Sequence, residues 1–353
     1  MQFEDRFYDD VKAIFKDSCF INGKYVEKFE KIFSQSHCVK HAVGTSCGTD
    51  ALSVILTALH LTPSDGVIYY PANTFIGSIL SALHMGFKCK PYDICLDTLN
   101  SNVNFFSEIG SDAAAVIAVH LYGYGLKDIT LLRARCDEMK VPLIEDCSQA
   151  HFQKVGHDYV GGFGIASFFS LYPGKNLGAA GDAGVICTND DRLAQKMRSI
   201  RNYGAEKKYH YTSRGYNHRM DAIQAAFLCH KIPFLHAENC ARRTIAGTYM
   251  DKINSEKVRL LNIDKDASVW HVFPVLVKDR KGFVLHMSDR GIQTNVHYPQ
   301  NIHHFDIWSG QVIAGDDSIK NADLAAAQVV SIPCHGAMST SQVETVYRAV
   351  NDY

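Results

Sequence analysis

One lysine stands apart in the stretch FFSLYPGKNLGAAGDAG, residues 168–184. A YPG turn leads to Lys175, and glycines and alanines follow it, so hardly another charge lies nearby in the sequence. Partial desolvation lowers the pKa of an ammonium group, and the neutral amine can act as a nucleophile and as a general base. The pattern therefore allows Schiff-base chemistry at Lys175, and an ordinary surface lysine in a loop is the alternative.

Three other stretches follow apolar runs and could hold parts of the same site. Asp146, in EDCSQA, ends such a run; a buried carboxylate needs a cation or a protonated ring nitrogen, unless it only caps a turn. GTSCGTDAL, residues 44–52, leads into a helix whose first N–H groups suit a phosphate, although an ordinary Thr or Asp N-cap is the commoner explanation of such a stretch alone. Phe75, in PANTF, could stack on a flat ring or simply pack in the core.

Together the four stretches supply an amine for an imine, a carboxylate for a ring nitrogen, a phosphate cradle and an aromatic plate. Pyridoxal phosphate requires these parts. In chain order they are the phosphate loop, the stacking residue, the acid and the lysine, each at the end of an expected strand. The sequence therefore predicts a pyridoxal-phosphate site.

Short apolar runs alternate with helical patterns and predict the elements that position these residues. The runs are residues 66–70, 114–119, 141–145, 166–170 and 183–188, and helices are expected over 49–61 and 128–140. Strands that alternate with helices indicate a doubly wound α/β domain with a mostly parallel sheet. Ligands of such a sheet bind at the carboxyl ends of its strands.

The character of the chain changes after residue 221. A long helical pattern begins there, and Pro233 should kink it or divide it in two. Residues 268–277 and 291–296 have strand patterns, and a C-terminal helix is expected over 342–350. We therefore expect a large domain over residues 1–235 and a smaller α+β domain over residues 236–353.

Composition excludes several other classes of protein. The chain has 353 residues, 36 of them basic and 37 acidic, with no long run of either sign, so we expect no nucleic-acid partner. The eleven cysteines form no CxxC pair and are interpreted as reduced thiols.

The acidic N-terminal stretch is unlike a signal peptide, and the longest apolar run is too short to span a bilayer. These features predict a cytoplasmic protein with no membrane partner. His297, His303 and His304 lack a partnered Glu or Asp at metal-site spacing, so no metal site is predicted.

Block by block, the sequence resembles the DegT/DnrJ/EryC1/StrS family of pyridoxal-phosphate-dependent nucleotide-sugar aminotransferases over nearly its whole length. The matching blocks are FINGKYVEKFE (20–30), GTDAL (48–52), PANTFIGS (71–78), VHLYG (119–123), IEDCSQAH (144–151), FFSLYPGKNLGAAGDAG (168–184), RNYG (201–204), GYNHRMDAIQAAFL (215–228) and GIQTNVHYP (291–299). The resemblance implies an aspartate-aminotransferase-like α/β fold (fold type I), pyridoxal 5'-phosphate as cofactor, and a homodimer with shared active sites.

Carried onto this chain, the resemblance also implies residue roles. Lys175 forms the internal aldimine, Asp146 pairs with the pyridine nitrogen and Gln149 meets the ring hydroxyl. The phosphate is held by the backbone of Gly48 and Thr49, by the Ser170 hydroxyl and by Asn217 of the partner subunit, while Phe75 stacks on one ring face and Ser148 lies at the other. Tyr172, Arg219 and His297 are expected near the sugar, its diphosphate or the amino donor.

The resemblance further implies a reaction. Lysine at position 175, where some family members have histidine, favours transamination over dehydration. YPGKNLGAAGDAG is more similar to the branch that acts at C-3 of the sugar than to the C-4 branch. The expected substrates are a dTDP-3-keto-6-deoxyhexose and L-glutamate, and the expected product is a 3-amino sugar for a surface polysaccharide or a glycosylated natural product. The alternatives are a C-4 aminotransferase, a UDP-sugar 3-aminotransferase or a dehydratase of the same family, and a non-catalytic regulatory protein that keeps the fold.

Overall fold

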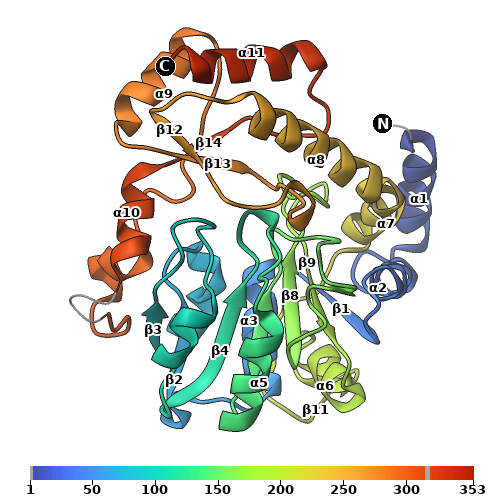
Figure 1. Ribbon diagram of the computed structural model, residues 1–353. Coiled ribbons are helices and arrows are strands. Elements are labelled where there is room, and N and C mark those ends of the chain that lie inside the picture. Colours follow the sequence, from blue (N-terminus) through green and yellow to red (C-terminus); the bar gives the residue numbers. More distant parts are fainter. Residues whose placement is uncertain (1–2, 315–318) are drawn as a thin grey trace.

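Helices and strands alternate through most of the chain in the computed structural model, which describes residues 3–314 and 319–353 (Figure 1). The helices are α1 (Glu4–Asp17), α2 (Lys24–Ser36), α3 (Gly48–Ala58), α4 (Leu80–His84), α5 (Ile129–Met139), α6 (Asp191–Ile200), α7 (Ala222–Lys231), α8 (Leu235–Lys252), α9 (Arg280–Asp289), α10 (Lys320–Gln328) and α11 (Thr340–Asn351). The strands are β1 (His41–Thr45), β2 (Val67–Pro71), β3 (Lys88–Tyr92), β4 (Ala113–Val119), β5 (Leu143–Asp146), β6 (Lys154–Val155), β7 (Asp158–Tyr159), β8 (Ala166–Ser170), β9 (Gly184–Thr188), β10 (Ala205–Lys207), β11 (His210–Tyr211), β12 (Val258–Leu260), β13 (Phe273–Val277) and β14 (Val329–Ile332). Residues 1–2 of the predicted large domain and 315–318 of the predicted small one lie outside the described part.

A seven-stranded sheet in the order β1-β9-β8-β5-β4-β2-β3 forms the centre of the large domain. All five predicted strands are present, as β2, β4, β5, β8 and β9. Along the sheet, β3, β2, β4, β5 and β8 run parallel to one another. The exception is β9, which is antiparallel to both β1 and β8. A loop without a helix joins β8 to β9, and without a crossover helix the chain returns in the opposite direction. That returning loop carries Lys175.

Both faces of the sheet are covered, as expected for a mostly parallel sheet. Every residue of β4 is buried. Ala115 and Ile117 belong to the same hydrophobic cluster as the apolar side chains of α3, whereas Val116 and Ala118 belong to the cluster that contains those of α5. Figure 1 shows α3 behind the sheet and α5 in front of it. The alternation of side chains along β4 therefore packs one helix on each face.

The predicted helices form within a few residues of their expected bounds. The pattern over 49–61 corresponds to α3 and that over 128–140 to α5. The long pattern after residue 221 divides into α7, a 3-10 turn over Ile232–Phe234, and α8. Pro233 lies inside that turn, as expected for a residue that lacks an amide hydrogen and clashes with the preceding turn of a helix. No helix within the described ranges is long and apolar enough to cross a membrane.

The C-terminal part forms a second, antiparallel sheet in the order β12-β13-β14, which lies with α8 to α11 above the large sheet in Figure 1. The strand expected over 268–277 starts only at Phe273. The residues before it pair instead with the large domain, where the N–H groups of Val269 and His271 donate to the carbonyls of Gly123 and Tyr122. The boundary near residue 235 coincides with the start of α8 and stays a prediction.

The prediction of a strand over residues 291–296 is wrong. Only Asn295 makes a bridge, to Ser331 at the edge of β14. The chain then continues to His297 and Tyr298, which line a cavity between the two sheets. An apolar alternation predicted pairing there, but the segment leaves the sheet after one bridge.

Candidate active site

A cavity of about 630 Å³ lies at the carboxyl edge of the large sheet, beneath residues from the C-terminal part. Ten residues that the sequence places at the site line it: Gly48, Thr49, Phe75, Asp146, Ser148, Gln149, Ser170, Tyr172, Lys175 and His297. They come from the ends of β1, β2, β5 and β8 and from the segment after residue 291. Strand ends of a parallel sheet meet at one edge, so the fold brings these distant stretches together.

Lys175 sits at the end of a tight turn that points it into the cavity. Its backbone N–H donates to the carbonyl of Tyr172 at 2.8 Å. The next residue, Asn176, is buried and donates to Asn239 Oδ1 and to the carbonyl of Val269, at 2.9 and 3.0 Å. These bonds hold the loop against α8 and against the segment that precedes β13.

Burial gives Lys175 an unusual acidity. Desolvation by the cavity walls lowers its pKa from 10.5 to about 8, and the nearby Asp146 carboxylate partly opposes the shift. A substantial fraction of the amine is therefore neutral near physiological pH. A neutral amine in a cavity can attack a carbonyl and can accept a proton, which is the chemistry expected from the sequence.

Asp146 ends β5 and is buried, with 5% of its surface exposed. Its Oδ1 accepts from the backbone N–H of Ser148 at 2.9 Å, and its Oδ2 accepts from the Ser78 hydroxyl at 2.6 Å. An ionised carboxylate offers about four acceptor positions, so two remain for a group in the cavity. This carboxylate can therefore meet a protonated ring nitrogen.

The start of α3 forms a cradle for an anion. The first bond within this helix runs from the Ala51 N–H to the Cys47 carbonyl, so the N–H groups of Gly48 and Thr49 precede the helical hydrogen bonds. A side chain at Gly48 would come within 2.9 Å of Ser170 Cβ, and one at Gly184 would lie 2.4 Å from the Cys47 carbonyl carbon. Glycine is thus needed at both positions for the backbone to approach so closely, and the cradle suits a phosphate.

Two aromatic rings and an amide border the cavity next to this cradle. Phe75 is 52% exposed, and its ring centroid lies 5.6 Å from that of Tyr298. Gln149 accepts from the Tyr122 N–H at 2.6 Å and donates to the Tyr298 hydroxyl at 3.0 Å. An exposed ring at a cavity wall can stack on a flat ligand, and the Gln149 amide is positioned for a hydroxyl partner such as that of Tyr298.

Asn217 and Arg219 do not reach the cavity of their own chain. Asn217 is exposed and bridges Asn202. Arg219 donates to Asn202 Oδ1 at 3.3 Å, and its guanidinium lies 5.2 Å from the ring centroid of Tyr203. Their predicted contacts with a phosphate or a substrate would have to be made to another subunit, and both roles stay predictions.

The C-terminal part contributes cavity residues that only the structure reveals. His271, Val272, Asn295 and Tyr298 all line the cavity. Only Asn295 and Tyr298 lie within a block of the resemblance, and no motif in the sequence marks His271 or Val272 as a site residue. His297 was expected, and its Nδ1 lies 2.9 Å from Ser331 Oγ. Burial and the nearby Lys175 amine lower the pKa of His297, which favours its neutral imidazole form.

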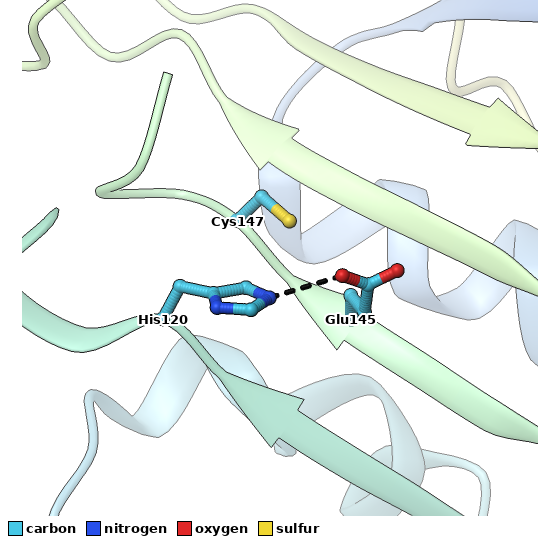
Figure 2. Close-up of side chains that lie close together, drawn as sticks. All are labelled: His120, Glu145 and Cys147. Atoms are coloured by element: carbon cyan, nitrogen blue, oxygen red, sulfur yellow. Dashed lines mark hydrogen bonds and ion pairs between the residues drawn. The ribbon is translucent and has the colours of Figure 1, made fainter. Parts of the chain in front are cut away.

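Beneath the cavity, a buried pair that sequence analysis did not identify anchors the ends of β4 and β5. Figure 2 shows the His120 ring pointing toward Glu145, with Cys147 beside them. His120 Nδ1 accepts from the Leu126 N–H at 3.0 Å, so its proton lies on Nε2, which donates to Glu145 Oε2 at 3.0 Å. The Glu145 carboxylate also accepts three backbone N–H bonds, from Gly161, Phe163 and Gly164, at 2.7 to 2.8 Å.

This arrangement is a structural anchor and does not suit a metal. The lone pairs that would bind an ion already accept hydrogen bonds, and burial raises the pKa of the Cys147 thiol, which disfavours the thiolate.

Away from the cavity, His303 and His304 do have an acidic partner, which their spacing in the sequence did not show. Both Nε2 atoms lie near Asp323 Oδ1, at 3.1 and 2.8 Å. Asp323 is remote in sequence, and the three form a hydrogen-bonded group at the surface.

Comparisons with known proteins agree with this geometry. The model of the DegT/DnrJ/EryC1/StrS aminotransferase family matches residues 2–351. The chain is 35% identical over 355 residues to a dTDP-3-amino-3,6-dideoxy-alpha-D-galactopyranose transaminase of Aneurinibacillus thermoaerophilus, covering 100% of this chain and 96% of the relative. The structure of S. venezuelae DesV in complex with a ketimine intermediate matches with a TM-score of 0.94 at 30% identity, covering 99% of this chain and 95% of that one. That of NtdA from Bacillus subtilis, with bound cofactor PMP, matches with a TM-score of 0.89 at 26% identity, covering 99% and 81%.

Proposed function

Because this chain belongs to the DegT/DnrJ/EryC1/StrS aminotransferase family and is a pyridoxal-phosphate-dependent sugar aminotransferase, we propose a specific reaction for it. It transfers the amino group of L-glutamate to the C-3 carbonyl of a dTDP-3-keto-6-deoxyhexose. The observation that carries the proposal is the cavity itself, where Lys175, with its pKa lowered to about 8, shares the space with Asp146 and the start of α3.

The residues present fit the cofactor. Lys175 would hold pyridoxal phosphate covalently, and Asp146 would keep its ring nitrogen protonated. The N–H groups of Gly48 and Thr49, with the Ser170 hydroxyl, would bind its phosphate, in a cradle that a Cβ at Gly48 would fill. Phe75 would stack on the ring, and Gln149 would bind the ring hydroxyl. When bound, the cofactor supplies an electron sink for the bond broken at the carbon that bears the amino group.

Lys175 then moves the protons of the reaction. Its amine takes the proton from Cα of L-glutamate in the first half of the reaction, and its ammonium form returns a proton to C-3 of the sugar in the second. A pKa of about 8 suits both duties, because the base and acid forms are each populated near neutral pH.

The choice of C-3 and of a dTDP-sugar is supported by the loop that carries the lysine and by one relative. The stretch YPGKNLGAAGDAG is similar to the branch that acts at C-3. The Aneurinibacillus relative is named as a transaminase of a dTDP-3-amino sugar. Tyr172 and His297, which both line the cavity, are the residues that we expect to contact the sugar.

The charge of the cavity supports a homodimer with shared sites. Lys175 is the only lysine or arginine among the described residues that line it, beside the carboxylates of Asp146 and Asp182. The cofactor phosphate, both carboxylates of glutamate and a nucleotide diphosphate are all anions, so further cations and hydrogen-bond donors must come from elsewhere. The exposed segment 205–219 carries Lys207, Lys208 and Arg214 along with Asn217 and Arg219. We propose that this segment of each subunit completes the cavity of the other.

Mixing two inactive variants tests the shared site. Lys175→Ala removes the amine, and Asn217→Asp places a carboxylate where the phosphate should bind. If Asn217 acts across the dimer, co-expression of the two variants restores about a quarter of the wild-type activity, because half of the dimers contain one intact site. Lys175→Ala mixed with Asp146→Asn is the matched control, and it should stay inactive. No recovery with the first pair would place Asn217 outside the partner's site.

The reaction is tested by mixing the purified protein with pyridoxal phosphate, then with L-glutamate, and then with candidate keto-sugars. The visible band of the bound cofactor should bleach with glutamate and return with the dTDP-3-keto-sugar, and NMR of the product should show an amine at C-3. An amine at C-4, or a response only to UDP-sugars, would assign the protein to another branch of the family. A protein that never develops the visible band would be a regulatory member that keeps the fold.

A further inference from the structure

Behind the Asp146 carboxylate lies a buried chain of two hydroxyl groups. Ser78 Oγ lies 2.6 Å from Asp146 Oδ2, and Thr74 Oγ1 lies 2.7 Å from Ser78 Oγ. The exposed fractions of Thr74, Ser78 and Asp146 are 3%, 2% and 5%. All three line the cavity, and the chain runs from the segment after β2 to the carboxylate that is expected to meet the cofactor ring.

The direction of the two hydrogen bonds follows from chemistry. An ionised carboxylate only accepts, so the single proton of Ser78 goes to Asp146 Oδ2. The Ser78 oxygen is then free to accept, and Thr74 must be the donor of the 2.7 Å bond. Both hydroxyls therefore point the same way, and such a chain strengthens its terminal bond because each donor polarises the next.

Hydrogen bonds to the charged form of a carboxylate favour that form and make it a weaker base. Asp146 receives two such bonds, from the Ser148 backbone at 2.9 Å and from the Ser78 side chain. The backbone donor is fixed by the fold, whereas the Ser78 donor is a side chain that one substitution removes. Ser78 is thus the adjustable part of the hydrogen-bond environment of the Asp146 carboxylate.

We propose that Ser78, backed by Thr74, is a positioning residue that holds the Asp146 carboxylate correctly aimed, so that the proton shared with the pyridine nitrogen stays on the nitrogen. The inference rests on the proposed pairing of Asp146 with that nitrogen. Without the Ser78 donor, Asp146 keeps only the hydrogen bond from the Ser148 N–H and can rotate about this one remaining anchor. The proton then shifts from the ring toward the carboxylate, and the ring withdraws electrons less strongly.

The test is the protonation of the ring nitrogen itself, which a merely structural role of Ser78 would not change. Pyridoxal phosphate labelled with ¹⁵N at the ring is bound to the wild type and to Ser78→Ala, and the ¹⁵N NMR signal is followed. Ser167→Ala is the matched control, because Ser167 is also a buried donor, at 2.8 Å from the Gly161 carbonyl, but does not contact Asp146.

In Ser78→Ala the signal should move toward the unprotonated position and kcat should fall about tenfold, as expected for a lost hydrogen bond to a charged group. Ser167→Ala should leave both unchanged, and Ser78→Thr, which keeps the hydroxyl, should restore the wild-type signal. A wild-type ¹⁵N signal in Ser78→Ala would overturn the inference. If Ser78→Ala does not bind the cofactor, Thr74→Val removes only the outer donor and should give a smaller shift in the same direction, and no shift there would overturn it.

Asp146→Asn separates this inference from the function on which it rests. If Asp146→Asn moves the ¹⁵N signal and neither Ser78→Ala nor Thr74→Val does, only the role of Ser78 fails. If Asp146→Asn also leaves the ring nitrogen protonated, the pairing of Asp146 with that nitrogen fails, and the inference fails with it.

Discussion

The reactivity of Lys175 in the cofactor-free protein should depend on pH in a way that no exposed lysine can match. Its pKa is about 8, against an ordinary value of 10.5, because the cavity walls desolvate the ammonium group. At pH 7 a pKa of about 8 leaves about one-tenth of the amine neutral, whereas an ordinary lysine has about one part in 3,000. The neutral, nucleophilic form is therefore enriched about 300-fold at Lys175.

Competitive labelling measures this difference. The protein is treated with trace acetic anhydride across a series of pH values, and mass spectrometry reports the acetylation of each lysine-containing peptide. Labelling of Lys175 should rise with pH and level off just above pH 8, since only the deprotonated amine reacts, while exposed lysines keep rising toward 10.5. Exposed lysines such as Lys31 serve as internal standards in the same sample.

Asp146→Asn sharpens the test. The Asp146 carboxylate raises the pKa of Lys175 against the effect of desolvation, so its removal should move the labelling midpoint below that of the wild type. A Lys175 midpoint near 10.5, or a midpoint that rises in Asp146→Asn, would refute the argument that burial controls this amine.

Lys175→Ala should bind the cofactor without a covalent bond and should abolish turnover, because no amine remains to move the proton; continued release of 2-oxoglutarate from glutamate would contradict the assignment. Gly184→Ala should weaken cofactor binding strongly, since the new Cβ would lie 2.4 Å from the Cys47 carbonyl carbon and displace the start of α3. Fluorescence titration measures the Kd, and Gly162→Ala, where the nearest atom is 3.5 Å away, is the control that should match the wild type. Burial lowers the pKa of His37 from 6.5 to about 3, so below pH 6.5 the unfolded chain binds a proton that the folded chain does not. His37 alone should therefore lower the free energy of unfolding by about 1.4 kcal/mol for each pH unit between 6.5 and 3, and urea denaturation should show a correspondingly shallower fall in His37→Gln; equal slopes would exclude a contribution from His37.

The strands at the centre of the sheet could be predicted because a strand that is buried on both faces has an uninterrupted run of apolar residues. Every residue of β4 is buried, and its apolar run is uninterrupted. The edge strand β3 was missed, since it alternates exposed Lys88 with buried Cys89 and then contains Pro91, a composition typical of an edge. β1, at the other edge, was not predicted as a strand, and its last residues were interpreted only as the start of a phosphate loop. A sheet edge has one neighbour, so it carries a weaker sequence signal than the centre.

The sequence by itself determined which groups meet in the cavity: the amine of Lys175, the carboxylate of Asp146, the start of α3 and the ring of Phe75. It could do so because each follows a predicted strand, and the carboxyl ends of parallel strands share one edge. Only the tertiary structure decided what these groups touch. Ser78 is 68 residues from Asp146, and Tyr298 is 149 residues from Gln149. Such contacts depend on how strands pack side by side and on how the C-terminal part covers the large sheet, and no local pattern of residue types encodes that packing.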